Sequence, residues 1–202
     1  MGSDLETTPT RSYDVQTMPL SSTETITWRD AQRMPDDGNR YEAIGGELFM
    51  TPSPSVRHQI LVVRLYDALR PLLPTAQGGM LLVAPLGVES EDSREGVQPD
   101  LLFVSGKRRD LLVGASVRGA PDLVVEVLSP STASRDRGIK RRLYERLGVP
   151  QYWIVDPVAE AIDVWRFGDD PECERFEGTL PVRLGADEVG VIDLEAVFVA
   201  DL

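Results

Sequence analysis

Two acidic residues stand inside or directly beside strongly apolar segments of this chain. Glu126 lies in LVVEVL, residues 123–128, where every other residue is aliphatic. Asp100 comes directly before the apolar residues of QPDLLFVS, residues 98–105. Burying an ionised carboxylate without a partner is costly. Each carboxylate therefore needs either a neighbouring cation or a chemical role.

Paired carboxylates on neighbouring strands suit a hard divalent cation. Facing side chains on such strands lie about 5 Å apart, and two carboxylates at that spacing repel unless a cation lies between them. Mg²⁺ takes oxygen ligands, keeps several waters and accepts phosphate oxygens as well. We expect Asp100 and Glu126 to share one Mg²⁺ (or Mn²⁺).

A basic segment follows Glu126. Residues 135–146 hold six of the 21 basic residues of the chain, namely Arg135, Arg137, Lys140, Arg141, Arg142 and Arg146. A basic helix start beside a metal would hold a phosphate. We expect a phosphate-bearing substrate to contact this face through Arg137 and Arg141. Tyr144 lies four residues after Lys140 on the same helical face, which indicates either packing or a phosphate contact.

These segments carry a family resemblance. PDLLFV and GAPDLVVEVLSPSTASRDRGIKRRLYERLGVPQYWIVDP resemble the Uma2-type (DUF820) endonuclease family of the PD-(D/E)XK nuclease superfamily, and RYEAIGGELFMTPSPSVRHQ is similar to its N-terminal motif. The likeness runs from about residue 27 to the end. It implies a restriction-endonuclease-like α/β (or α+β) fold, a three-layer sandwich whose mixed central sheet is flanked by helices. It also implies metal-dependent cleavage of DNA phosphodiesters.

The resemblance also assigns site residues. Asp100 matches the aspartate of the family motif and Glu126 its acidic residue. Leu128 stands where the motif usually has lysine. In similar proteins a lysine on the following helix substitutes, which here is Lys140.

The composition of the chain supports Lys140 independently. The chain has only two lysines among 21 basic residues, so a lysine kept within an arginine-rich helix indicates a need for a compact ammonium with an adjustable pKa. The alternative is a surface ion pair with Asp136, four residues earlier.

The metal site expected from these residues has four contributors. Asp100, Glu126 and the backbone carbonyl of Val127 would hold the ion, and Glu42 would complete its shell through a water. Lys140 would orient the attacking water or help to deprotonate it.

Alternative interpretations of these residues stay open. Glu126 could pair with an arginine such as Arg141, Asp100 could cap a loop, and Glu42 could be a solvated strand residue. His58, the only histidine, could be a base, a phosphate contact or a structural residue. Asp122 also follows a proline, but it lies about 13 Å along the strand from Glu126 at 3.3 Å per residue, so these two cannot share an ion.

Apolar periodicity predicts the elements that position these residues. TWRDAQRMP predicts a short helix that is capped by Thr27 and ended by Pro35. RYEAIGGELFMT predicts a hairpin that turns at Gly45–Gly46, and SPSVRHQILVVRLYDALRPLL predicts an amphipathic helix.

The second half of the chain alternates strands with one helix. MLLVAPLGVES, QPDLLFVS and APDLVVEVLSP predict strands, with a charged link over residues 106–119. STASRDRGIKRRLYERLG predicts a helix that is capped by Ser131 or Thr132 and ended by Gly148. QYWIVDP, with Trp153 buried, and AIDVWRF predict two further strands, and DLEAVF predicts a last helix. We expect one nuclease domain over residues 25–202, after a loose arm of residues 1–24.

Composition limits the classes of function. The net charge of −12 argues against a general nucleic-acid coat protein. One cysteine cannot form an internal disulfide, and no apolar run approaches 18 residues, so we expect a cytoplasmic protein without membrane contact.

Two other classes of function fit the same residues. The alternatives are a catalytically inactive nucleic-acid-binding or regulatory module on the same fold, and a structural protein in which Glu126 forms a buried ion pair. Because duplex DNA has two-fold symmetry, we expect a homodimer formed through the late strands, which include Trp165, or through the arm. The alternative is that Trp165 packs on the first long helix of its own chain.

Overall fold

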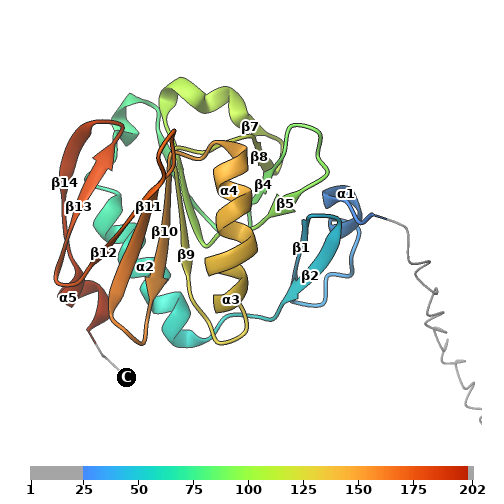
Figure 1. The fold of residues 1–202 in the computed structure, drawn as a ribbon, viewed down its shortest axis with the longest axis horizontal. Helices are drawn as coiled ribbons and strands as arrows, with labels where there is room; N and C mark the ends of the chain where they lie inside the picture. The colour runs from blue at the N-terminus through green and yellow to red at the C-terminus, as the bar shows by residue number, and fades with distance from the viewer. Residues whose placement is uncertain (1–24, 200–202) are drawn as a thin grey trace, which may run out of the picture.

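The computed structural model describes residues 25–199. The predicted loose arm, residues 1–24, lies outside the described residues. Two six-stranded sheets, one hairpin and several helices make up the described part (Figure 1). No helix within residues 25–199 is long and apolar enough to cross a membrane.

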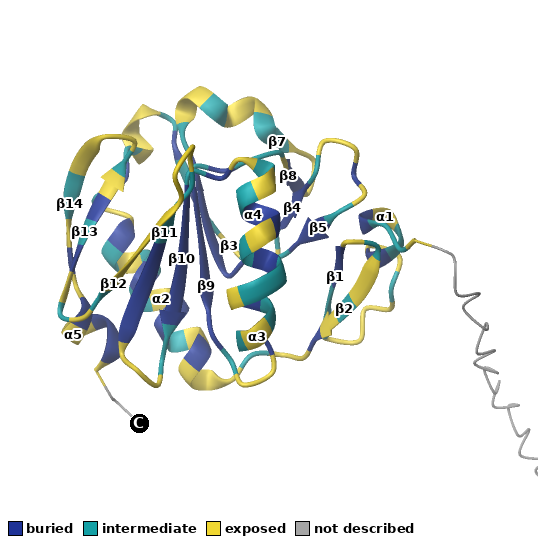
Figure 2. Cartoon of the chain, viewed as in Figure 1, coloured by how far each residue is buried: buried dark blue, intermediate teal, exposed yellow. Residues whose placement is uncertain are grey.

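The central sheet is mixed, as the sequence predicts. Its strand order is β12 (Glu172–Phe176), β11 (Ala161–Arg166), β10 (Gln151–Asp156), β9 (Leu123–Val127), β6 (Leu101–Val104) and β3 (Met80–Val83). Strands β9 and β10 run parallel, and every other neighbouring pair is antiparallel. Both β9 and β10 are buried along most of their length (Figure 2).

A smaller second sheet lies beside the central one. Its order is β2 (Glu47–Thr51), β1 (Arg40–Ile44), β5 (Gly96–Val97), β4 (Gly87–Glu89), β8 (Ser116–Arg118) and β7 (Leu112–Val113). Strands β13 (Thr179–Leu184) and β14 (Asp187–Asp193) form a separate hairpin. The predicted hairpin at Gly45–Gly46 is the β1–β2 pair, so that prediction is confirmed.

Helices cover both faces of the central sheet (Figure 1). Helix α2 (Val56–Leu69) covers one face, and α3 (Ala133–Arg135), the π-helical segment η3 (Asp136–Lys140) and α4 (Arg141–Leu147) cover the other. The other helical elements are α1 (Trp28–Ala31), which packs on β1 of the second sheet, α5 (Leu194–Phe198), and the short 3₁₀ turns η1 (Thr75–Gln77) and η2 (Gly106–Leu111). Thr27 and Asp30 form the capping box of α1. Gly148 ends α4 in the left-handed conformation with φ 80°, which costs glycine little.

Alternation along β9 divides the interior into two cores. Leu123, Val125 and Val127 belong to the core under α2. Val124 and Leu128 belong to the core under α4, which also includes residues of the second sheet. Because successive side chains of a strand point to opposite faces, Glu126 shares the face of Val124 and points toward α4. The three-layer sandwich predicted from the sequence is confirmed.

Three predictions about elements were wrong or incomplete. MLLVAPLGVES is two strands in different sheets, because Pro85 has no N–H to continue the ladder and the chain leaves the central sheet there. The link over residues 106–119 contains η2, β7 and β8. The helix after Glu126 has a π-helical turn in its middle, and the Thr132 side chain does not cap it.

The late strands are enclosed by the chain itself. Strand β11 is not at the sheet edge, because β12 pairs along it. The ring of Trp165 lies under the guanidinium of Arg141, 4.7 Å from ring centroid to Cζ, and stacks with Phe167. Trp165 therefore packs toward α4. The alternative expectation, that it packs on α2, is wrong.

We predict that α2 is held to the sheet chiefly by its buried leucines. Leu65 has no exposed surface in the core under α2, so Leu65→Ala should cost about 2–5 kcal/mol of unfolding free energy. Val63, on the outward side of the same helix, is 56% exposed, and Val63→Ala should change stability by no more than about 0.5 kcal/mol. Urea unfolding of both variants tests this, and equal losses would contradict the assignment of the buried face.

Candidate functional site

The sheet register places the two predicted carboxylates opposite each other. Strands β6 and β9 are antiparallel, with Leu101 opposite Val125 and Leu102 opposite Val124. Continuing this register by one residue places Asp100 opposite Glu126. The Asp100 carboxylate also accepts the backbone N–H of Val127, from N to Oδ2 2.9 Å. Antiparallel pairing thus brings together two residues that are 26 positions apart.

A cavity of about 200 Å³ contains both carboxylates. Glu42, Lys140, His58 and Arg40 also line it, so the structure brings Asp100, Glu126, Glu42, His58 and Lys140 to one place. Hydroxyl groups and prolines of two loops form the rest of its wall, namely Thr51, Pro52, Ser53, Pro54 and Ser55 from one and Ser129, Pro130, Ser131 and Thr132 from the other.

The ammonium of Lys140 lies among three carboxylates. Its Nζ is 2.9 Å from Oε1 of Glu126, 3.0 Å from Oε1 of Glu42 and 3.5 Å from Oδ1 of Asp136. The Tyr144 hydroxyl donates to the same Glu126 oxygen at 2.8 Å. The Asp136–Lys140 pair that could have been a surface pair does form, but both side chains are buried.

The π-helical turn contributes to this arrangement. In η3 the backbone follows a wider turn than an α-helix, and Asp136 and Lys140 are both buried at its two ends. Tyr144, four residues further, is also buried. Three polar residues of one helical segment therefore face the sheet at Glu126.

Burial and charge change the proton affinity of this cluster. Burial raises the pKa of Glu126 to about 8, against the lowering effect of Lys140. Burial also raises the pKa of Asp136, again opposed by Lys140. For Lys140, burial lowers the pKa, but Glu126, Glu42 and Asp136 together raise it more. Lys140 is therefore a protonated ammonium at neutral pH.

Asp100 has a different environment. Its Oδ1 accepts from Arg40 Nη1 at 3.0 Å, and its Oδ2 lies 3.0 Å from His58 Nε2. Burial would raise the pKa of Asp100, but the hydrogen bond from His58, then the charge of Arg40 and the Val127 N–H, lower it overall. Asp100 is thus ionised, so His58 Nε2 donates to it. Among the described residues, Nδ1 of His58 has no hydrogen-bond partner although it is buried.

The second sheet contributes Glu42 from β1. Its Oε1 accepts the backbone N–H of Gln98 at 2.8 Å, and its Oε2 lies 3.3 Å from Arg135 Nη1. Arg135 also donates to Thr51 Oγ1. Sequence reasoning did not single out Arg40 or the site role of Arg135 and Asp136. The only signal in the sequence for these partners is that a buried carboxylate such as Asp100 or Glu42 needs a cation near it.

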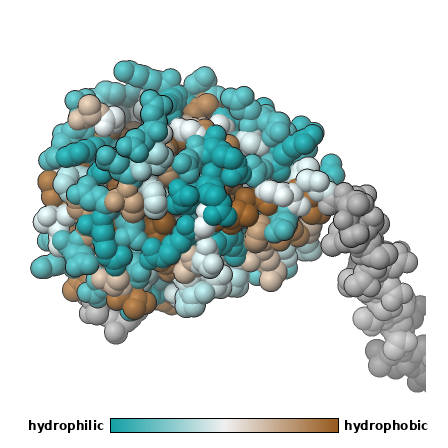
Figure 3. Space-filling view, viewed as in Figure 1, coloured by the Kyte–Doolittle hydropathy of each residue, from teal (hydrophilic) through white to brown (hydrophobic). Residues whose placement is uncertain are grey.

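Ion pairs occupy most of the cations on the basic helical segment. Arg137 pairs with Asp156 and Asp163, and Arg141 pairs with Glu145. Lys140, Arg135 and Arg146 have carboxylate partners as well. The face over α4 is largely hydrophilic (Figure 3). Binding of DNA by Arg137 and Arg141 stays a prediction.

The contacts of four further residues decide between the alternative interpretations left open by the sequence. Glu126 pairs with Lys140 and not with Arg141. Glu42 is buried rather than solvated. Tyr144 is fully buried and its hydroxyl is used by Glu126, so it presents no surface to a substrate. Asp122 accepts from the Ser105 N–H at the opposite end of β9, away from the cavity.

The donor atoms of the cavity fit a hard cation. Mg²⁺ commonly uses one or two protein carboxylates and completes its shell with waters or phosphate oxygens. Asp100, Glu126 and the Val127 carbonyl supply oxygen donors of this kind. No group of three or more His, Cys, Asp or Glu side chains in residues 25–199 is arranged to hold a metal, so such an ion would take most ligands from water and substrate.

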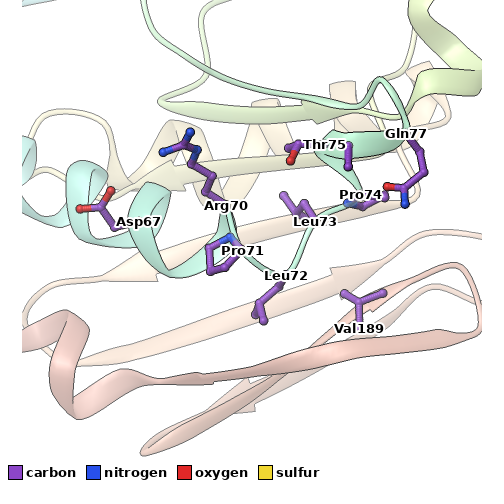
Figure 4. A pocket seen from close by; sticks show the side chains of 10 residues that line it. Asp67, Arg70, Pro71, Leu72, Leu73, Pro74, Thr75, Gln77 and Val189 are labelled. Atoms are coloured by element: carbon purple, nitrogen blue, oxygen red, sulfur yellow. The ribbon is translucent and has the colours of Figure 1, made fainter.

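A larger cavity lies elsewhere. It has about 800 Å³ and lies where the end of α2 and the following loop face Val189 of β14 (Figure 4). Its charged residues, Asp67 and Arg70, are exposed. It lacks the buried carboxylates of the smaller cavity, which is why we place the candidate site at Asp100 and Glu126.

We predict a pH-dependent stability that originates at Glu126. Its pKa is about 8 in the folded protein and 4.5 is its ordinary value, so the folded state holds a proton that the unfolded chain releases between these pH values. Stability should therefore fall as pH rises through this window. Glu126→Gln should reduce that slope in urea unfolding measured from pH 5 to pH 8. An unchanged slope would contradict the raised pKa.

Comparisons with known proteins identify the family of the chain. Residues 28–190 match the Uma2 family, described as "putative restriction endonuclease". The Synechocystis sp. protein slr1290 is 30% identical over 175 residues, which cover 85% of this chain and 87% of that protein. The crystal structure of a "putative nuclease belonging to DUF820" from Anabaena variabilis has a TM-score of 0.70 at 17% identity, covering 86% of this chain and 97% of that one. The chain belongs to the Uma2 (DUF820) family.

Proposed function

We propose that this protein is a metal-dependent endonuclease that hydrolyses phosphodiester bonds of DNA. One observation carries the proposal. Asp100 and Glu126 lie opposite each other at adjoining strand ends, in one cavity with the ammonium of Lys140. Membership of a family described as putative restriction endonucleases supports the same activity.

Asp100 and Glu126, with the Val127 carbonyl, are the proposed ligands of Mg²⁺ or Mn²⁺. Such an ion would lower the pKa of a bound water and stabilise the charge that develops on phosphate. Arg40 and His58 hold the Asp100 carboxylate through ion-pair and hydrogen-bond contacts. Tyr144 holds that of Glu126.

Lys140 has the role of a fixed positive charge. Because its pKa is raised by three carboxylates, it is a poor base, so we assign it to orienting the water and stabilising the phosphate, not to deprotonation. Glu42 is close enough to Lys140 to position it and would reach the ion only through a water.

Substrate contacts are assigned to groups at the cavity. His58 lies beside Asp100 and its Nδ1 is free of a hydrogen-bond partner within residues 25–199, so it can contact a phosphate after a small rotation. Arg137 and Arg141 would need to exchange carboxylate partners for phosphates, which makes their contribution dependent on salt.

We predict that two conservative substitutions abolish cleavage. Asp100→Asn and Glu126→Gln each remove a proposed ligand charge and should lower Mn²⁺-dependent DNA cleavage by about 100-fold or more, since even supporting residues of metal sites contribute 10–100-fold. Gel assays of a supercoiled plasmid, a linear duplex and a single strand measure this.

Asp122→Asn is the matched control for these variants. Asp122 also follows a proline and flanks the same strand, but it bonds to Ser105 away from the cavity, so its variant should retain cleavage. Asp100→Asn and Glu126→Gln variants that cleave DNA as fast as the Asp122→Asn variant would contradict the proposed site. Wild-type protein that neither binds Mn²⁺ nor cleaves DNA would instead favour an inactive binding module.

We also propose that the protein acts as a homodimer, which would present two sites related by a two-fold axis. Each chain has one candidate site. Sedimentation of the full chain at micromolar concentration should show a species of twice 22.3 kDa. A single species at the monomer mass would contradict the dimer.

A further inference from the structure

An apolar groove continues from the candidate site along α2. It has about 580 Å³ and lies between α2 and the edge strand β3. Five residues line both the groove and the carboxylate cavity, namely Arg40, Ser53, Pro54, His58 and Asp100. A ligand whose phosphate lies at Asp100 would therefore extend its next group into this groove.

The walls of the groove are mainly apolar. Val62, Val63 and Tyr66 line it from α2, and Leu82, Val83 and Pro85 line it from the β3 side. Val63 and Val83 are 56% and 47% exposed, which is high for aliphatic residues. Arg40 and Gln59 add polar groups to the wall. Apolar walls beside an aromatic ring and a guanidinium match the chemistry of a nucleobase.

The carboxylate cavity limits how a substrate reaches it. It has only about 200 Å³, and the side chains of Asp100 and Glu126 are each 4% exposed. A duplex keeps its base faces stacked inside, so it offers nothing to an apolar groove. A strand whose bases are unstacked offers both a base face and a flexible phosphate.

We propose that the groove binds one unpaired nucleobase and that the preferred substrate is single-stranded nucleic acid. The phosphate next to this base would enter the cavity at Asp100. The inference rests on the proposed nuclease function, from which the experiment below separates it. A peptide strand added to the edge of β3 is the competing occupant.

The test measures binding to fluorescein-labelled oligothymidylate and to a blunt duplex of equal length. Fluorescence anisotropy in EDTA gives the affinities without cleavage. Val63→Glu and Val63→Lys both destroy the apolar wall but change charge in opposite directions. Val191→Glu and Val191→Lys are the matched controls, because Val191 is 53% exposed on the β14 hairpin and does not line the groove.

The wild type should bind the single strand about tenfold more tightly than the duplex, and both Val63 variants should lose about tenfold of that affinity. The Val191 variants should stay within about threefold of the wild type. Equal or tighter duplex binding overturns the inference. Val63 variants that bind the single strand as tightly as the wild type also overturn it, as expected if the groove binds a peptide. So does stronger binding by Val63→Lys together with weaker binding by Val63→Glu, because charge and not the apolar wall would then control the affinity.

Cleavage with Mn²⁺ separates the two proposals. Single-strand preference in binding without cleavage of any DNA would overturn the nuclease and leave the groove assignment standing. Cleavage of duplex and single strand at equal rates would overturn the groove assignment and leave the nuclease standing.

Discussion

The ammonium of Lys140 joins parts of the chain that have no other reason to meet. It contacts Glu126 of the central sheet, Glu42 of the second sheet and Asp136 of its own helical segment. Each of these charges alone would be expensive to bury. Together they offset much of that cost, and the arrangement holds only if the two sheets and the π-helical turn keep their positions. Removing the ammonium would leave three carboxylates facing one another.

This constraint also shapes the electrostatics of the cavity. Burial raises the pKa of Glu126, and the charges of Asp136, Asp100 and Glu42 add to this effect, so that together they outweigh the lowering effect of Lys140. Asp100, held by Arg40 and His58, is ionised by contrast. Two facing carboxylates with opposite tendencies form a site that gains from an added cation. A divalent ion would allow Glu126 to ionise, which links metal binding to proton release.

Local pattern predicted the elements with strong periodicity, and the acids within or beside apolar strands predicted the pair of Asp100 and Glu126. The α2 helix, the β9 strand and the β10–β11 hairpin follow from apolar spacing, and Asp100 and Glu126 meet because antiparallel strands have a fixed register. Strands β12 to β14 were not predicted, because β12 is mostly exposed and charged and lacks clear alternation. The division of MLLVAPLGVES at Pro85 could not be predicted, because the sequence does not show that its two halves join different sheets.

The partners within the site are where sequence reasoning stops. Arg40 reaches Asp100 across 60 residues and Arg135 reaches Glu42 across 93, and no local pattern records such distances. The same difficulty affected the basic segment, whose cations looked available for DNA but mostly pair with carboxylates from other elements.

The most direct measurement is an anomalous difference map from crystals of the protein soaked in Mn²⁺. We predict one peak between the carboxylates of Asp100 and Glu126, about 2.1 Å from an oxygen of each, as for Mg²⁺. A peak elsewhere, or none at this position while Lys140 keeps its contacts with Glu126, would contradict the proposed metal site.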